Sequence, residues 1–210
     1  MTAPRRLLSV AALLALFLYA SVGSDAARRQ DQDRARGSLA GQLLVATPDL
    51  DDPNFVETVV YLVHHDEAGA MGLVINRVLG AGPLAKVLEG LGVAPDGASD
   101  LELRVHYGGP VEPARGFMLH SPDYRGEDTV VLSDLAALTV SPDILQDIAA
   151  GKGPRRSLFA LGYAGWGPEQ LEGELAAGAW VVVAPDADLL FDDHPETKWQ
   201  RAFDRREIEL

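Results

Sequence analysis

Short apolar runs separated by turn-forming residues make up most of the chain after residue 40. Runs rich in Val, Leu and Tyr favour β-strands, and the Gly, Pro and Asp residues between them favour turns. The pattern predicts strands at residues 43–46, 55–64, 71–75, 101–105, 116–120, 129–132, 157–161 and 180–184. Turn chemistry at 65–69 predicts a hairpin between the second and third strands, and the turn at 108–110 predicts another between the fourth and fifth.

Helical spacing of apolar residues occurs in four segments, at residues 84–91, 142–150, 168–177 and 195–206. Before the second of them, Ser141 suits the N-cap, Pro142 the first turn and Asp143 the positive end of the helix dipole. Strands and helices alternate irregularly, without the steady βαβ order of a doubly wound sheet. We therefore predict an α+β (irregular α/β) fold, with a largely antiparallel or mixed sheet flanked by helices, in a single compact domain over residues 41–206.

Residues 162–167 form an unusual string in which three glycines are spaced by Tyr163, Ala164 and Trp166. A glycine-rich loop before a helix can cradle a phosphate at the helix N-terminus. Glycines at this spacing also let backbone segments pack closely. The second interpretation is favoured, because Glu169 places negative charge where the anion would lie.

The charge of the chain is divided unevenly. Residues 1–39 carry six Arg against three acidic residues, which leaves 12 basic and 28 acidic residues in the remainder, a net charge of −16. Such a surface repels phosphate backbones, so no nucleic-acid partner is expected. The chain has no cysteine, which excludes disulfides, thiolate nucleophiles and thiolate metal sites.

The N-terminus has the three parts of a secretory signal peptide: a basic start at 1–6, an uncharged apolar run at 7–22, and small residues at 23–26. This predicts cleavage after Ala26 and export to the periplasm, followed by a flexible linker over residues 27–40.

The signal peptide has two alternatives, and the first of them follows from the arginines beyond the apolar run, Arg28, Arg29, Arg34 and Arg36. Positive charge tends to stay cytoplasmic, so residues 1–26 could be an inner-membrane anchor with the domain facing the cytoplasm. A start site misassigned upstream of Gly37 would leave the domain cytoplasmic. Contact with a membrane is expected only through this N-terminal segment.

Several strings along the chain resemble, in order and spacing, those of the YqgE/AlgH-like family of bacterial proteins. They are PDLDDPNF (48–55), GAMGLVINR (69–77), GGPV (108–111), GFMLH (116–120), TVSPDIL (139–145), LGYAGW (161–166) and QLE (170–172). The resemblance covers residues 41–203. It implies a compact α/β fold and, through the family name, a link to regulation of exopolysaccharide (alginate) production, but it supplies no catalytic residue.

The chain departs from that family in three places. Val78 stands where a Pro usually follows the Asn-Arg pair, and Pro168-Glu169 replaces a small Gly-containing pair. Relatives usually lack the N-terminal extension of about 40 residues and are cytosolic, so the expected location of this chain differs from theirs.

No metal or cofactor is expected. Neighbouring His64 and His65 on a strand point to opposite faces and cannot share a metal. The acidic string at 49–54 lacks the Gly and Glu that a calcium-binding EF-hand loop needs at its sixth and twelfth positions, so it is interpreted as a turn.

Polar and aromatic residues beside the turns and within the family strings are candidates for a ligand cleft. They are His65, Asn76, Arg77, His120, Ser141, Asp143, Tyr163, Trp166, Gln170 and Glu172. No catalytic residue is assigned, because no complete catalytic motif is present and the G-x-S-x-G elbow is missing. The leading hypothesis is a non-enzymatic binding or regulatory module acting on a protein partner or small ligand. The alternative is a hydrolase with a His–carboxylate or Ser–His site.

Overall fold

The computed structural model describes residues 37–95 and 101–206. The segments predicted as a signal peptide or anchor and most of the predicted linker lie outside these residues. From Leu39 onward the chain forms one unit. Leu39 already packs against a core cluster, and Gly41 N–H donates to the carbonyl of Leu62 at 2.7 Å. The part of the chain described here contains no helix long and apolar enough to cross a membrane.

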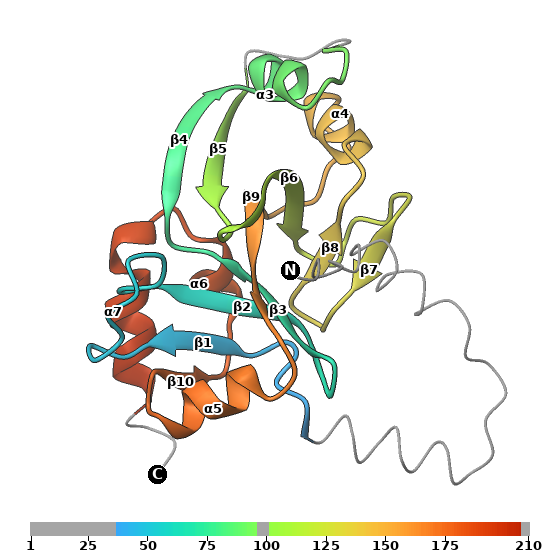
Figure 1. The fold of residues 1–210 in the computed structure, drawn as a ribbon. Helices are drawn as coiled ribbons and strands as arrows, with labels where there is room; N and C mark the ends of the chain where they lie inside the picture. The colour runs from blue at the N-terminus through green and yellow to red at the C-terminus, as the bar shows by residue number, and fades with distance from the viewer. Residues whose placement is uncertain (1–36, 96–100, 207–210) are drawn as a thin grey trace, which may run out of the picture. The chain divides into compact units, whose positions relative to one another are not determined.

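One sheet of ten strands organises the described domain (Figure 1). The strands are β1 (Leu43–Ala46), β2 (Val59–Asp66), β3 (Gly69–Val74), β4 (Val78–Pro83), β5 (Glu102–Tyr107), β6 (Val111–His120), β7 (Thr129–Val131), β8 (Ala137–Thr139), β9 (Ser157–Trp166) and β10 (Trp180–Val183). The helices in the described residues are α3 (Leu84–Gly90), α4 (Asp143–Ala149), α5 (Gln170–Ala176), α6 (Ala187–Phe191) and α7 (Pro195–Arg205).

The strand order is β10-β1-β2-β3-β9-β6-β8-β7, with β5 also pairing with β9 and β4 pairing with β5. Every pair is antiparallel except β5–β9. The predicted α+β class, with a largely antiparallel sheet, is therefore confirmed. The hairpin predicted around residues 65–69 is β2–β3, in which Val60 faces Val74 and Asp66 faces Gly69.

Strand β9 runs through the middle of the sheet (Figure 1) and joins its two parts. Its first half pairs with β5 and β6, whereas its last three residues pair with β3. Gly162 lies between the halves at φ +73°, a left-handed conformation that glycine adopts without steric strain. A Cβ at Gly162 would overlap the carbonyl oxygen of Gly109, because the two backbones cross there.

Within the described residues, two clusters of buried apolar side chains pack on the sheet. The first cluster gathers around Trp166 and Trp180, with Leu44, Leu62 and α5 residue Leu171. The second cluster gathers around residues of β6 and β9 and is covered by α3 and α4: Met118, Phe159, Leu84, Leu88, Ile144 and Leu145. Burial of these side chains supplies most of the driving force for folding.

The structure corrects three expectations. Residues 101–105 and 116–120 do not form a hairpin, because β5 pairs with β4 and β9 while β6 pairs with β9 and β8. The string 162–167 is not a loop, since β9 continues to Trp166. Strand β4 was missed because its sequence, VLGAGP, has no alternation of apolar and polar residues.

Candidate functional site

His65 at the end of β2 pairs with Glu172 on α5. Its Nε2 lies 2.7 Å from Oε1 of Glu172, and its Nδ1 accepts the backbone N–H of Leu39 at 2.9 Å. Because Nδ1 accepts, Nε2 carries the proton and donates it to the carboxylate. The pKa of Glu172 is lowered, first by its own backbone N–H and then by His65. The pair therefore ties α5 and the start of the domain to β2.

Glu174, two residues further along α5, accepts hydrogen bonds from two tryptophans. Its Oε2 receives the indole N–H groups of Trp166 at 2.9 Å and Trp180 at 2.8 Å. Its Oε1 receives the side-chain amide of Gln170 at 2.9 Å, and Oε1 of Gln170 in turn accepts the N–H of Gly167 at 3.0 Å. Trp166 and Gln170, two of the candidates, therefore position α5 through a residue that sequence reasoning missed.

Asn76 and Arg77 hold the loop before β2. Oδ1 of Asn76 accepts the N–H of Val59 at 2.8 Å, and its Nδ2 donates to the carbonyl of Glu57 at 2.8 Å. The guanidinium of Arg77 donates to three further carbonyls of that loop, those of residues 53, 54 and 56, at 2.7–3.0 Å. The loop at 53–58 is thus fixed by two side chains that lie between β3 and β4.

His120 is fully buried at the end of β6. Nδ1 donates to the carbonyl of Ser121 at 2.8 Å, and Nε2 lies 2.9 Å from the hydroxyl of Thr139, which contacts the hydroxyl of Thr129 at 2.7 Å. Burial lowers the pKa of His120. A neutral ring with both nitrogens hydrogen-bonded joins β6, β7 and β8.

Ser141 and Asp143 lie at the start of α4. The hydroxyl of Ser141 accepts the N–H of Asp143 at 3.3 Å, although Pro142 rather than Ser141 occupies the N-cap position. Tyr163 packs edge-to-face on Phe117 with ring centroids 5.8 Å apart, and burial raises the pKa of its hydroxyl.

Nine of the ten candidate residues therefore fall into three groups, and the tenth, Tyr163, packs on Phe117 of β6. His65, Trp166, Gln170 and Glu172 surround α5, Asn76 and Arg77 hold the loop before β2, and His120, Ser141 and Asp143 lie around β6 and α4. Helices α4 and α5 lie at opposite ends of the domain in Figure 1. Over residues 37–95 and 101–206, no three His, Asp or Glu side chains converge to hold a metal ion.

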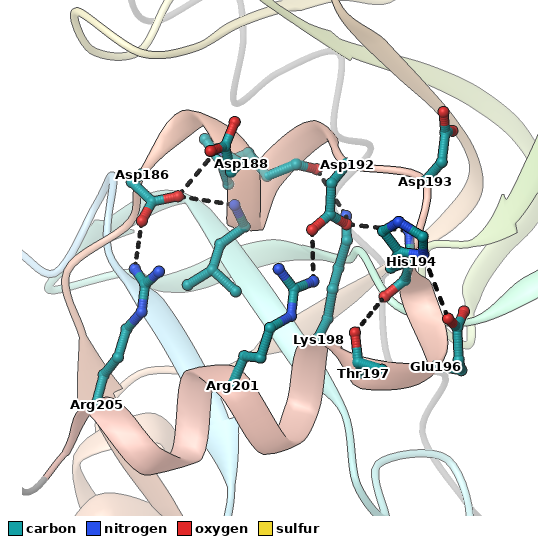
Figure 2. Close-up of polar contacts among 12 residues, drawn as sticks. Asp186, Asp188, Asp192, Asp193, His194, Glu196, Thr197, Lys198, Arg201 and Arg205 are labelled. Atoms are coloured by element: carbon teal, nitrogen blue, oxygen red, sulfur yellow. Dashed lines mark hydrogen bonds and ion pairs between the residues drawn. The ribbon is translucent and has the colours of Figure 1, made fainter.

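A second polar cluster, also missed from the sequence, links α6 to α7 (Figure 2). Asp186 caps α6 by accepting the N–H groups of Asp188 and Leu189, and it pairs with Arg205 at 2.5 Å. Lys198 points inward and is 1% exposed. Its Nζ donates to the carbonyl of Leu190 at 3.0 Å and lies 3.7 Å from Asp192.

Burial lowers the pKa of Lys198 to about 8, with Arg201 and Arg104 adding to the effect and Asp192 opposing it. Between pH 8 and 10.5 the unfolded chain binds more protons at this site than the folded chain, so folding becomes more favourable as the pH rises. From pH 8 to 9.5 the free energy of unfolding is expected to gain about 2 kcal/mol from this residue. Urea denaturation should show that gain in the wild type and not in Lys198→Met; parallel pH profiles for the two would contradict it.

The fold and its polar groups define a small α+β domain built around one shared central strand. The chain belongs to the AlgH-like family, whose family model matches residues 43–210. A UPF0301 protein from Methylococcus capsulatus is 44% identical over 163 residues, covering 78% of this chain and 88% of the relative. Another, from Rhodospirillum rubrum, is 45% identical over 173 residues, covering 82% and 90%. The family resemblance drawn from the sequence strings is confirmed.

Two solved structures are similar to this one. The solution structure of the AlgH protein from Pseudomonas aeruginosa has a TM-score of 0.69 and 40% identity, covering 91% of this chain and 94% of that one. A crystal structure of a protein from Corynebacterium diphtheriae has a TM-score of 0.56 and 18% identity over 70% and 76% of the chains, a likeness of fold alone.

Proposed function

We propose that this domain is a regulatory binding module that contacts a protein partner through the surface formed by residues 53–57 and the start of β4. The observation that carries the proposal is the exposure of three large apolar side chains there. Val56 is 39% exposed, Val78 41% and Leu79 60%. Exposed apolar side chains gathered on one surface are typical of protein interaction sites.

This surface is rigid, which favours binding. Arg77 donates to the backbone carbonyl of Val56 at 2.7 Å and immediately precedes Val78, so one side chain joins the backbone of the loop to the start of β4. The hydroxyl of Tyr107 also donates to Asn54 at 3.2 Å. Glu57 is held at φ +52°, a strained conformation for a non-glycine residue. A surface fixed before binding loses little conformational entropy when the partner docks.

Charge indicates the chemistry of the partner. Asp51 and Glu57 are exposed beside the apolar residues, and the domain carries a net charge of −16 outside residues 1–39. Apolar residues with an acidic border are complementary to an apolar anchor flanked by Lys or Arg. Such binding weakens as the salt concentration rises, because salt screens the exposed charges.

Leu79 provides the test. Biotin-labelled full-length protein carrying Leu79→Asp is expected to recover at least tenfold less of the partner from a cell extract than the wild type does. Val131→Asp is the matched control, because Val131 is 48% exposed on another edge strand, β7. Recovery of the same proteins in equal amounts with both variants, or substrate turnover by the wild type, would refute the proposal.

The hydrolase alternative would rest on His65 and Glu172, the only hydrogen-bonded His–carboxylate pair among the candidate residues that lie in the described chain. A general base needs one ring nitrogen aimed at the substrate. Here Nε2 faces Glu172 and Nδ1 faces the N–H of Leu39, so both nitrogens are already engaged in holding the fold. The geometry supports a structural role for this pair better than a catalytic one.

A further inference from the structure

Strand β4 forms an open edge of the sheet, next to the loop at 53–57. It pairs with β5 on one side, and no strand of the described chain pairs with its other side. Figure 1 shows β4 on the outer side of β5, away from β9. Residues 78–81 of the strand are exposed. An open edge offers unpaired N–H and C=O groups, to which an extended segment of another chain can add as a further strand.

The register of β4 on β5 determines which backbone groups point outward. The N–H of Leu84, directly after β4, donates to the carbonyl of Leu101 at 2.8 Å, and Gly82 and Gly80 face β5 in the same register. In an antiparallel ladder, residues that bond the neighbouring strand alternate with residues whose N–H and C=O groups point the other way. Ala81 therefore directs both its N–H and its C=O to the open side.

Pro83 limits the length of any added strand. It has the same orientation as Ala81 but no N–H, so it offers only its carbonyl oxygen to the open side. Directly after it the chain turns into α3, which begins at Leu84. The open edge is therefore suited to a short extended segment that pairs along residues 79–83.

Two glycines favour the close approach of a second backbone to this edge. An added Cβ at Gly80 or Gly82 would meet no atom within 4 Å, and neither residue has a positive φ. Glycine weakens a strand, yet nothing in the described fold requires it at these two positions. Glycine in a strand also occurs where another backbone approaches closely.

Charge defines the partner that fits this edge. An exposed carboxylate lies near each end of β4: Glu57, whose carbonyl accepts from Asn76 at 2.8 Å, near the start, and Glu102 opposite the last residue. The one arginine on the facing part of β5, Arg104, is paired with Asp193 at 3.0 Å. Lys or Arg on both sides of an apolar residue complements this arrangement.

We propose that β4 binds its partner by strand addition. An extended segment of the partner, with an apolar residue flanked by Lys or Arg, lies along the open edge and exchanges backbone hydrogen bonds with Ala81. This inference rests on the proposed function and adds the way in which that surface recognises its partner. A second copy of the chain fits poorly, because antiparallel pairing of two β4 strands brings Glu57 of one copy toward Glu102 of the other, and like charges repel.

The probe is an octapeptide of alternating Lys and Val with blocked ends, added to the full-length protein. Titration followed by NMR chemical shifts should give a dissociation constant on the order of 1 mM. Saturating peptide should slow hydrogen exchange of the Ala81 amide about tenfold. The fully N-methylated peptide keeps the side chains but has no N–H donors, so it should bind about tenfold more weakly, the loss expected for one or two hydrogen bonds.

Ala81→Pro removes the outward N–H without taking a hydrogen bond from β5, a change that edge strands tolerate. It should weaken peptide binding about tenfold, whereas the matched control Ala81→Ser keeps the N–H and should bind as the wild type does. Urea denaturation of both variants shows whether the fold is retained. If Ala81→Pro does not fold, the comparison of the two peptides on the wild type decides.

Strand addition would be overturned by an absence of peptide binding, by equal binding of the two peptides, or by equal binding of the peptide to Ala81→Pro and Ala81→Ser. A wild-type dimer that Ala81→Pro converts to monomers in sedimentation would assign the edge to a second copy instead. Recovery of the partner from extract separates this inference from the proposed function. If Leu79→Asp lowers recovery while Ala81→Pro matches Ala81→Ser, strand addition alone fails; if neither variant lowers it, the proposed function fails as well.

Discussion

Replacing Gly162 by alanine is expected to lower the free energy of unfolding by about 2–5 kcal/mol. One part of the loss is conformational, since φ +73° costs a non-glycine residue about 1–2 kcal/mol. The other part is steric, because the added Cβ would overlap the carbonyl oxygen of Gly109 and lie 3.0 Å from that of Val111. Backbone shifts forced by overpacking cost about 1–3 kcal/mol.

Two other glycines separate these contributions. Gly178 has φ +77° with open space around it, so Gly178→Ala should cost only the conformational part. Gly82 has neither a positive φ nor a close neighbour, so Gly82→Ala should leave stability nearly unchanged. The measurement is urea denaturation of the three variants. Equal losses for Gly162→Ala and Gly178→Ala would show that the crossing of backbones contributes nothing.

Replacing Glu174 by alanine is expected to lower the free energy of unfolding by about 3 kcal/mol. Trp166 and Trp180 are 6% and 3% exposed, so removal of the carboxylate leaves two buried indole N–H groups without their acceptor. Each hydrogen bond to a charged group contributes about 1.5–3 kcal/mol. Loss of these two hydrogen bonds should also release α5 from β10. The fluorescence of Trp166 and Trp180 reports that release.

Glu172 on the same helix is the control for Glu174. Its side chain is 53% exposed and its bond to His65 faces solvent, so Glu172→Ala should cost less than about 1 kcal/mol. Glu174→Gln should give an intermediate loss, because its carbonyl oxygen still accepts from the indoles while its NH₂ faces the NH₂ of Gln170. Similar losses for Glu172→Ala and Glu174→Ala would contradict the role assigned to Glu174.

Local patterns predicted those parts of the fold that depend on neighbours in the sequence. The β2–β3 hairpin follows from apolar strands on either side of a turn, and Pro195 marks the start of α7. The pairing of β5 with β9 could not be predicted in the same way, because these strands are joined by no short turn. Gly162 was interpreted as part of a glycine-rich loop. Glycine is required at this position because a side chain would overlap the carbonyl oxygen of Gly109, which lies far away along the chain.

The candidate residues were chosen for their positions beside turns and within the family strings, but the sequence did not reveal their hydrogen-bond partners. His65 and Glu172 are separated by 107 positions, and Arg77 lies 21 to 24 positions from the carbonyls it holds. No spacing rule connects residues so far apart. Glu174 gave only a weak signal, its position one helical turn after Gln170, and Lys198 resembled any surface lysine of an amphipathic helix.

The late position of β9 and β10 in the chain governs the order in which this protein can fold during synthesis. Strand β3 lacks its second neighbour until residues 75–163 have been added, an interval on the order of 5–20 s at typical translation rates. Strand β1 waits still longer for β10. Throughout that time the nascent chain presents unpaired strand edges, which pair readily with other chains. A chaperone that holds the growing polypeptide protects it most during this interval, before the central strand emerges and closes the sheet.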